Sequence, residues 1–206
     1  NGAGKTTLIK IILDLIDANG GNTSIFDIPS QSIEARKNLS YLPEKFQPSR
    51  YLRGFEYLEL PLRYYGKTLD EDRARAQAAA LDLDPNVLDQ RVGSYSKGMG
   101  QKIGLAGSFL IDPPLQLLDE PMSGLDPRAR IKLKNELLRV KHEGKSIFFS
   151  SHILSDIDEI CDRIGVIHEG VLFFIGTPAE FKAKYGHSSL EQCFLNAIDA
   201  PTAKAA

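Results

Sequence analysis

The chain has 206 residues, of which 42% are hydrophobic and 25% charged, so it can bury a substantial core and should form a single domain. A net charge of -2 provides no basic footprint for nucleic acid or anionic lipid, and we expect no nucleic-acid partner. Two cysteines, Cys161 and Cys193, are too few for a disulfide framework and are expected to be buried thiols in a reducing compartment. The longest apolar run, 171–175, is far shorter than the ~20 residues of a membrane span.

The first residues of the chain are rich in glycine. Gly4-Lys5-Thr6 match the last three positions of the pattern G-x-x-x-x-G-K-[ST]. Glycines let backbone N–H groups curl around phosphate oxygens, and the start of a following helix adds more of them. Lys5 would place its charge on the β- and γ-phosphates, and the Thr6 hydroxyl would ligate Mg²⁺. We therefore expect a nucleotide triphosphate to bind here, through residues Asn1, Gly2, Ala3, Gly4, Lys5, Thr6 and Thr7.

The strand that such a loop follows would lie before residue 1. About five buried apolar side chains would contribute roughly 8–15 kcal/mol, as much as the whole stability of a typical domain. We therefore expect this chain to be a piece that lacks its first strand and folds poorly alone. After the loop, apolar residues predict a helix that is buried on most of its faces and ends at Gly20-Gly21; they are Leu8, Ile9, Ile11, Ile12, Leu15 and Ile16.

The rest of the first half predicts short strands and then a run of helices. We expect strands at 23–27 and 39–42, with a short polar helix at 30–38 between them. Residues 45–111 indicate an inserted helical subdomain, with helices around Pro61, at 70–82 and at 97–110.

The second half returns to alternating strands and helices. The expected elements are a strand at 115–119, a helix at 127–142, a strand at 146–150, a helix at 153–162, a hairpin of 164–168 and 171–175, and two short helices. Such alternation indicates a parallel sheet. We expect one α/β domain over 1–206: a P-loop NTPase parallel-sheet core (1–44 and 112–180) that ends in a small C-terminal hairpin, an inserted α-helical subdomain (45–111), and C-terminal helices (181–206).

A pair of carboxylates, Asp119 and Glu120, ends the apolar strand at 115–119. Open parallel sheets bind ligands at this edge. Asp119 could hold Mg²⁺, directly or through water, and Glu120 could act as general base on a water in line with the γ-phosphate. A charged turn is the alternative, which the phosphate loop in the same chain disfavours.

Two further segments are candidates for phosphate recognition. Ser96 suits the N-cap of the helix at 97–110, and the same helix start, with Gly98, would suit an anion. Because the chain already has one phosphate loop, we hypothesise that this second cradle serves the nucleotide of a partner copy. His152 follows the strand at 146–150, where a γ-phosphate could be sensed.

Together these residues closely resemble the nucleotide-binding domain of ABC transporters, over nearly the whole chain. Residues 1–7 look like the Walker A motif, 115–120 like Walker B with its catalytic Glu, and 123–126 like the D-loop. Residues 95–99 stand where the family has its LSGGQ signature, and His152 stands where it has the switch histidine.

The chain departs from the family pattern at three positions. Lys97 and Met99 replace the Gly and Gln of the signature, and Glu44 stands where the family usually has the Q-loop Gln. A carboxylate at residue 44 can still ligate Mg²⁺, although it adds negative charge. These variants resemble those of exporter-type ATPase subunits carried on a chain separate from the membrane subunit.

The resemblance implies that two such domains sandwich two ATP molecules head to tail, with Mg²⁺. Ser96 and Gly98 would then contact the γ-phosphate held by the other copy. Glu120 and His152 would position the attacking water, and Asp126 would link the two sites.

The resemblance also implies a place in the cell and a set of partners. The chain would be the ATPase subunit of a transporter, cytoplasmic and peripheral on the inner face of the cell membrane. Its partners would be a second nucleotide-binding domain, as a homo- or heterodimer, and a transmembrane permease subunit. The permease would dock around residues 45–53, whose basic side chains could equally be an ordinary solvated face.

Two other functions remain open at this stage. A soluble ABC-type ATPase acting on ribosomes or DNA would usually carry two such domains, or long coiled-coil or basic insertions, whereas the insertion at 45–111 is short and has no heptads. A catalytically idle binding module is favoured for this particular chain by the missing strand. It is disfavoured by the intact candidate residues Lys5, Asp119, Glu120 and His152.

Overall fold

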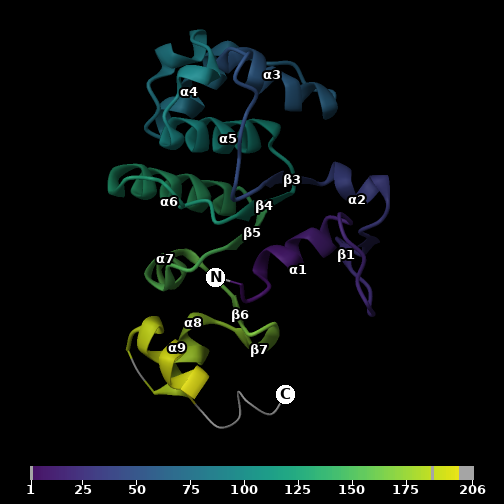
Figure 1. The fold of residues 1–206 in the computed structure, drawn as a ribbon, viewed down its shortest axis with the longest axis vertical. Coiled ribbons are helices and arrows are strands. Elements are labelled where there is room, and N and C mark those ends of the chain that lie inside the picture. Colours follow the sequence, from purple (N-terminus) through teal and green to yellow (C-terminus); the bar gives the residue numbers. More distant parts are fainter. Residues whose placement is uncertain (1, 187, 200–206) are drawn as a thin grey trace. The chain divides into compact units, whose positions relative to one another are not determined.

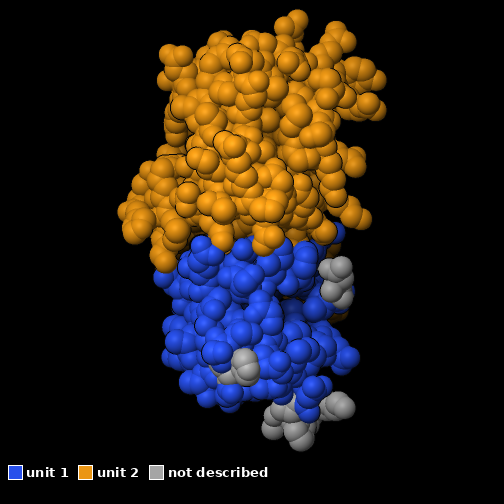
Figure 2. All heavy atoms as spheres, turned by 90° about the vertical axis from the view of Figure 1, so that its left-hand side faces the viewer, with its two compact units in different colours: residues 1–10, 151–206 blue, residues 11–150 orange. Residues whose placement is uncertain are grey.

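The structure is a computed structural model that describes residues 2–186 and 188–199. The chain divides into two compact units, residues 1–10 with 151–206 (unit 1) and residues 11–150 (unit 2), which Figure 2 colours blue and orange. Among the helices of the described ranges, none has the length and hydropathy needed to cross a membrane.

Unit 2 is built on a parallel sheet with the strand order β3-β4-β5 (Figure 1). These strands are β3 (Leu39–Leu42), β4 (Leu115–Asp119) and β5 (Ser146–Ser150), at the positions that the sequence predicts. The register pairs Leu42 with Leu118 and Asp119 with Ser150, so the carboxyl ends of all three strands meet at one edge. The predicted α/β class with a parallel sheet is confirmed.

Helix α5 (Lys97–Ile111) forms the centre of the helical part of unit 2. It packs against β3 on one side and against α3 (Gly54–Tyr64) and α4 (Glu71–Ala80) on the other, so every residue from 101 to 111 is buried. Figure 1 shows these three helices as one group. On the remaining side of unit 2, α6 (Pro127–His142) packs along β5 through an apolar stripe that includes Leu133 and Val140.

Short elements connect these parts. They are the strands β1 (Ser24–Ile25) and β2 (Ile28–Pro29), the helix α2 (Ile33–Lys37), and the 3₁₀ helices η1 (Pro85–Asp89) and η2 (Val92–Ser94). The single strand predicted at 23–27 is wrong, because Phe26 and Asp27 have φ angles of 50° and 62° and form the turn of a small hairpin. An extended strand cannot pass through that left-handed region.

The first helix, α1 (Lys5–Ile12), is shorter and less buried than the sequence predicts. Asp14 has a φ of 58°, in a region that aspartate tolerates but a helix cannot continue through. Ile9 is fully buried, whereas Leu15 and Ile16 are 61% and 41% exposed. The predicted helix, buried on most faces and running to the glycines at 20–21, is therefore wrong.

Besides the loop and the first residues of α1, the described part of unit 1 contains a hairpin and three helices. They are α7 (Leu154–Ile160), β6 (Ile164–His168), β7 (Val171–Gly176), α8 (Pro178–Tyr185) and α9 (Leu190–Asp199). The turn between β6 and β7 has positive φ at both Glu169 and Gly170, as a two-residue hairpin turn requires. Phe181, Leu190 and Cys193 are buried in the core of this unit, while Cys161 is only half-buried, so a buried thiol is correct for one cysteine.

Candidate functional site

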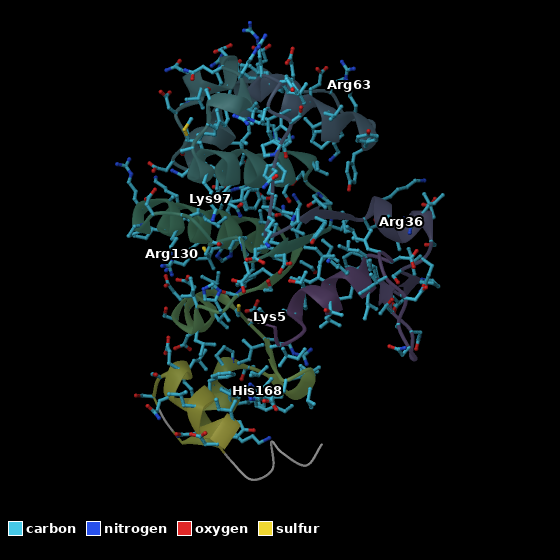
Figure 3. All side chains as sticks on the ribbon, viewed as in Figure 1. Lys5, Arg36, Arg63, Lys97, Arg130 and His168 are labelled. Carbon is cyan, nitrogen blue, oxygen red and sulfur yellow. The ribbon has the colours of Figure 1, made fainter. Side chains whose placement is uncertain are left out.

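The glycine-rich loop of unit 1 has the backbone that a phosphate cradle needs. Gly2 and Gly4 have φ angles of 81° and 104°, a region that glycine enters without steric cost. The loop is tied down by a hydrogen bond from the Gly170 N–H to the Ala3 carbonyl oxygen, 3.2 Å long. Helix α1 begins directly after it at Lys5, which Figure 3 labels, and its first turn has no acidic residue. The positive end of the helix dipole at this terminus favours an anion.

The other predicted residues of this segment fit the same arrangement. Thr6 is half-buried and Thr7 exposed, in the first turn of α1. Asn1 lies outside the described residues.

Two buried carboxylates stand at the edge of the sheet in unit 2. Asp119 is 1% exposed and Glu120 is 6% exposed. The Ser150 hydroxyl donates to Asp119 Oδ1 at 2.5 Å and accepts from the Glu120 N–H at 2.9 Å. Glu120 has a φ of 49°, a strained conformation for a non-glycine residue that is typical of functional positions. One hydroxyl therefore fixes both residues that the sequence singles out.

A carboxyl group of this edge also affects a neighbouring tyrosine. Burial and the negative charge of Asp119 both raise the pKa of Tyr41, on the neighbouring strand. Glu44 follows β3 at the same edge and is exposed.

The edge fits Mg²⁺ only with help from other ligands. Carboxylate oxygens are the donors that Mg²⁺ prefers. Among the described residues, however, no three side chains of the His, Cys, Asp or Glu type come together as a metal cluster. Such a site matches the habit of Mg²⁺, which binds one or two carboxylates together with substrate phosphates and water.

The predicted signature segment lies against the predicted D-loop within unit 2. Ser96 caps α5, accepting the Met99 N–H at 3.2 Å, and the first turn of α5 has no acidic residue. The Lys97 side chain runs along Gly124, since a Cβ at Gly124 would lie 3.5 Å from Lys97 Cε. A Cβ at Gly98 would lie 3.5 Å from the Gly124 carbonyl oxygen.

Asp126 ends this D-loop segment and caps α6. Its Oδ1 accepts the Ala129 N–H at 3.0 Å, and its Oδ2 lies 3.8 Å from Lys102 Nζ. The hydrogen bond from Ala129 and the positive charge of Lys102 hold the pKa of Asp126 below its ordinary value of 3.8. The side chain is therefore ionised at neutral pH.

Each unit thus contains part of the predicted site. The phosphate loop belongs to unit 1. So does His152, an exposed residue between β5 and α7. Unit 2 contains Glu44, Ser96, Gly98, Asp119, Glu120 and Asp126.

Sequence reasoning missed Ser150 and Lys102, which hold Asp119 and Asp126 respectively. A signal existed for Ser150: it ends the strand that runs parallel to β4, so a polar side chain there meets the carboxylates of its neighbour. Lys102 gives no such signal, because its partners come from separate loops.

Comparisons with known proteins show which family the chain resembles. A family model described as ABC transporter matches residues 1–123. An uncharacterized ABC transporter ATP-binding protein of Synechocystis sp. is 39% identical over 87% of this chain, and the chain spans 52% of that relative. The ABC transporter ATP-binding protein NatA of Bacillus subtilis is 32% identical over 85% of this chain and 73% of its own length.

A solved structure also matches over most of the chain. It is titled as the ATP-binding subunit of an ABC transporter and superposes with a TM-score of 0.84 at 31% identity. The superposition covers 95% of this chain and 83% of that one.

Proposed function

The chain belongs to the ABC transporter family, and on that basis we propose that it binds and hydrolyses ATP to drive a partner membrane subunit. The observation that carries the proposal is the pair of buried carboxylates, Asp119 and Glu120, which one serine hydroxyl fixes at the carboxyl edge of a parallel sheet. Relatives that are named as transporter ATP-binding proteins favour this function over an ATPase acting on ribosomes or DNA.

The phosphate loop binds the substrate in this proposal. Backbone N–H groups around Gly2 and Gly4 and the start of α1 donate to phosphate oxygens, and Lys5 adds a positive charge. Thr6, Asp119 and Glu44 are the residues that would hold Mg²⁺, which when bound neutralises charge on the phosphate oxygens.

Glu120 acts as the general base. It accepts a proton from the attacking water at its carboxylate, which its 6% exposure keeps away from bulk solvent. Ser150 fixes the Glu120 backbone by accepting its N–H, so that the carboxylate keeps its direction. His152 assists by orienting the same water.

A second copy completes the site. The start of α5, capped by Ser96 and free of acidic residues in its first turn, offers amide groups to an anion. With Gly98 it would contact the γ-phosphate bound by the partner copy, and Asp126 would link the two sites. Hydrolysis would release the dimer, because the bridging γ-phosphate is lost.

The membrane partner would dock on unit 2 near residues 45–53. Tyr51 in this segment is 86% exposed, and an exposed aromatic ring is typical of interfaces. This contact would hold the chain at the inner face of the membrane. Glu44, Lys97 and Met99 depart from the usual family motifs in a way that resembles exporter-type subunits, and these departures support an exporter.

The test is ATP binding and turnover by the full-length protein with Lys5→Ala. We expect loss of ATP affinity, measured by calorimetry, because the charge that meets the β- and γ-phosphates is gone. Lys10→Ala is the matched control, since Lys10 is an exposed residue of the same helix, and it should bind ATP as the wild type does. Unchanged ATP affinity in Lys5→Ala would overturn the assignment of the phosphate loop.

A further inference from the structure

A buried lysine connects the signature helix to the D-loop. The Lys102 side chain on α5 is 10% exposed. Its ammonium donates to the Asp82 carbonyl oxygen at 2.7 Å and to Asp82 Oδ2 at 3.2 Å, and it lies 3.8 Å from Asp126 Oδ2. An ammonium so deprived of water is stable only where fixed partners replace its hydration.

The backbone conformation of Asp82 allows it to bind Lys102 through two oxygens. It follows α4 with a φ of 58°, and this left-handed turn lets both its carbonyl oxygen and its carboxylate reach Lys102. Its other carboxylate oxygen, Oδ1, pairs with Arg128 Nε at 2.9 Å. Asp82 therefore binds one cation from α5 and another from the first turn of α6.

The link to Asp126 has a different character. Asp126 is 57% exposed, and the 3.8 Å separation is longer than a hydrogen bond. Its Oδ1 is already used by the Ala129 N–H, so Lys102 attracts the remaining oxygen and thereby sets the orientation of the carboxylate. The two hydrogen bonds to Asp82 are sufficient to stabilise the buried ammonium of Lys102. Its position beside Asp126 therefore indicates an additional role for the charge.

The D-loop segment 123–126 thus meets α5 at two points. Lys97, at the start of α5, runs along Gly124, and Lys102, five residues later, faces Asp126. Both points lie in unit 2 and join the segment to the same helix.

We propose that Lys102 is a positioning residue, which holds Asp126 and the segment 123–126 in register with the start of α5. The proposal rests on the proposed function, in which Ser96, Gly98 and Asp126 act at the nucleotides shared with a second copy. Through this ion pair, the signature segment and the D-loop of one copy move together and reach the shared nucleotides together.

A double-mutant cycle on ATP turnover in the full-length protein tests this coupling. We expect Lys102→Met and Asp126→Asn each to lower kcat by about tenfold. The double variant should have the kcat of the less active single variant and no lower. Lys102→Arg should restore most of the rate, because it keeps the charge. Two reductions that multiply, to about a hundredfold, would show that Lys102 acts independently of Asp126 and would overturn the proposal.

Hydrogen exchange of the amides at 123–126 supplies a readout that needs no turnover. Asp126→Asn keeps the oxygen that caps α6 but removes the charge, and we expect these amides to exchange several times faster in that variant. The matched control is Lys37→Met, which removes an exposed lysine that pairs with Glu34 on α2, and it should leave the segment unchanged. If Lys102→Met does not fold, this measurement decides alone, and unchanged exchange in Asp126→Asn overturns the proposal.

The two proposals fail in different ways. If Glu120→Gln leaves turnover unchanged, the proposed function fails, while the exchange experiment still reports on the ion pair between Lys102 and Asp126. If Glu120→Gln abolishes turnover but the cycle is multiplicative, only the role of Lys102 is wrong.

Discussion

Replacing Ser150 with alanine removes one hydroxyl on which both carboxylate residues of the sheet edge depend. The Ser150 hydroxyl accepts the Glu120 N–H at 2.9 Å and donates to Asp119 Oδ1 at 2.5 Å. Ser150 is 6% exposed, so water has little access to replace it. The variant therefore leaves a buried amide donor without its acceptor and a buried carboxylate without one of its donors.

The loss can be worked out from these two bonds. A buried polar group left without its partner costs about 1–3 kcal/mol, and a hydrogen bond to a carboxylate lies toward the upper end of that range. Some relaxation of the strand end will offset part of the sum. We expect Ser150→Ala to lower the free energy of unfolding by about 2–4 kcal/mol, a large fraction of the ~5–15 kcal/mol of a typical domain.

Urea unfolding, followed by circular dichroism, measures this loss. Ser146→Ala is the matched control, because Ser146 begins the same strand and is exposed, and its effect should stay within about 0.5 kcal/mol. The expected sign is a lower midpoint with an unchanged slope. A Ser150→Ala variant as stable as the Ser146→Ala control would refute the reasoning that this hydroxyl organises the sheet edge.

Two further predictions concern packing and charge. Gly54→Ala should lower the free energy of unfolding by about 1–3 kcal/mol, because its Cβ would lie 2.7 Å from the Leu88 Cα. In the control Gly100→Ala the new Cβ meets nothing within 4 Å, so this variant should be neutral or slightly stabilising. Equal urea midpoints for the two variants would contradict this. The lowered pKa of Asp126 means that its charge stabilises the fold above the ordinary pKa of 3.8 and that this advantage is lost as the pH falls through the lower folded-state pKa. Wild type should therefore melt above Asp126→Asn at pH 7 and converge with it below about pH 3.8; a melting difference that does not depend on pH would show that the charge contributes nothing.

Much of the fold could be predicted because its signals are local. The strand β4 and the helix α6 occur at the predicted residues, since an apolar run ends in two carboxylates and Asp126-Pro127 supplies a cap and a first helical residue. The hairpin of β6 and β7 follows from Glu169-Gly170 in the same way. In each case the residues that decide the structure are neighbours in sequence.

The errors arose where local and distant signals disagree. Apolar spacing favoured a helix through Ile16, but Asp14 adopts a left-handed conformation that ends it early. Phe26 has the high β-propensity of a strand residue and nevertheless sits in a turn, because β1 pairs with β2 only two residues later. The β-propensity of a single residue carries no information about which strands pair.

The candidate site divides in the same way. The glycine loop, Asp119 and Glu120 could be proposed from the sequence because their chemistry requires particular residue types in sequence. Lys102 could not, and Ser150 only through the register of two parallel strands, since a serine at the end of a strand and a lysine in a helix are ordinary until the fold sets them beside residues 20–31 positions away. What holds a functional residue in place is a property of packing, and the sequence shows it only through register.

The central claim is that Glu120 is the base of an ATP site completed by a second copy. The most direct measurement combines turnover and sedimentation velocity of Glu120→Gln with Mg²⁺ and ATP. The account predicts retained ATP affinity, a fall in turnover of about a hundredfold or more, and a stable ATP-bound dimer. Turnover equal to that of the wild type, or a variant that stays monomeric with ATP bound, would contradict it.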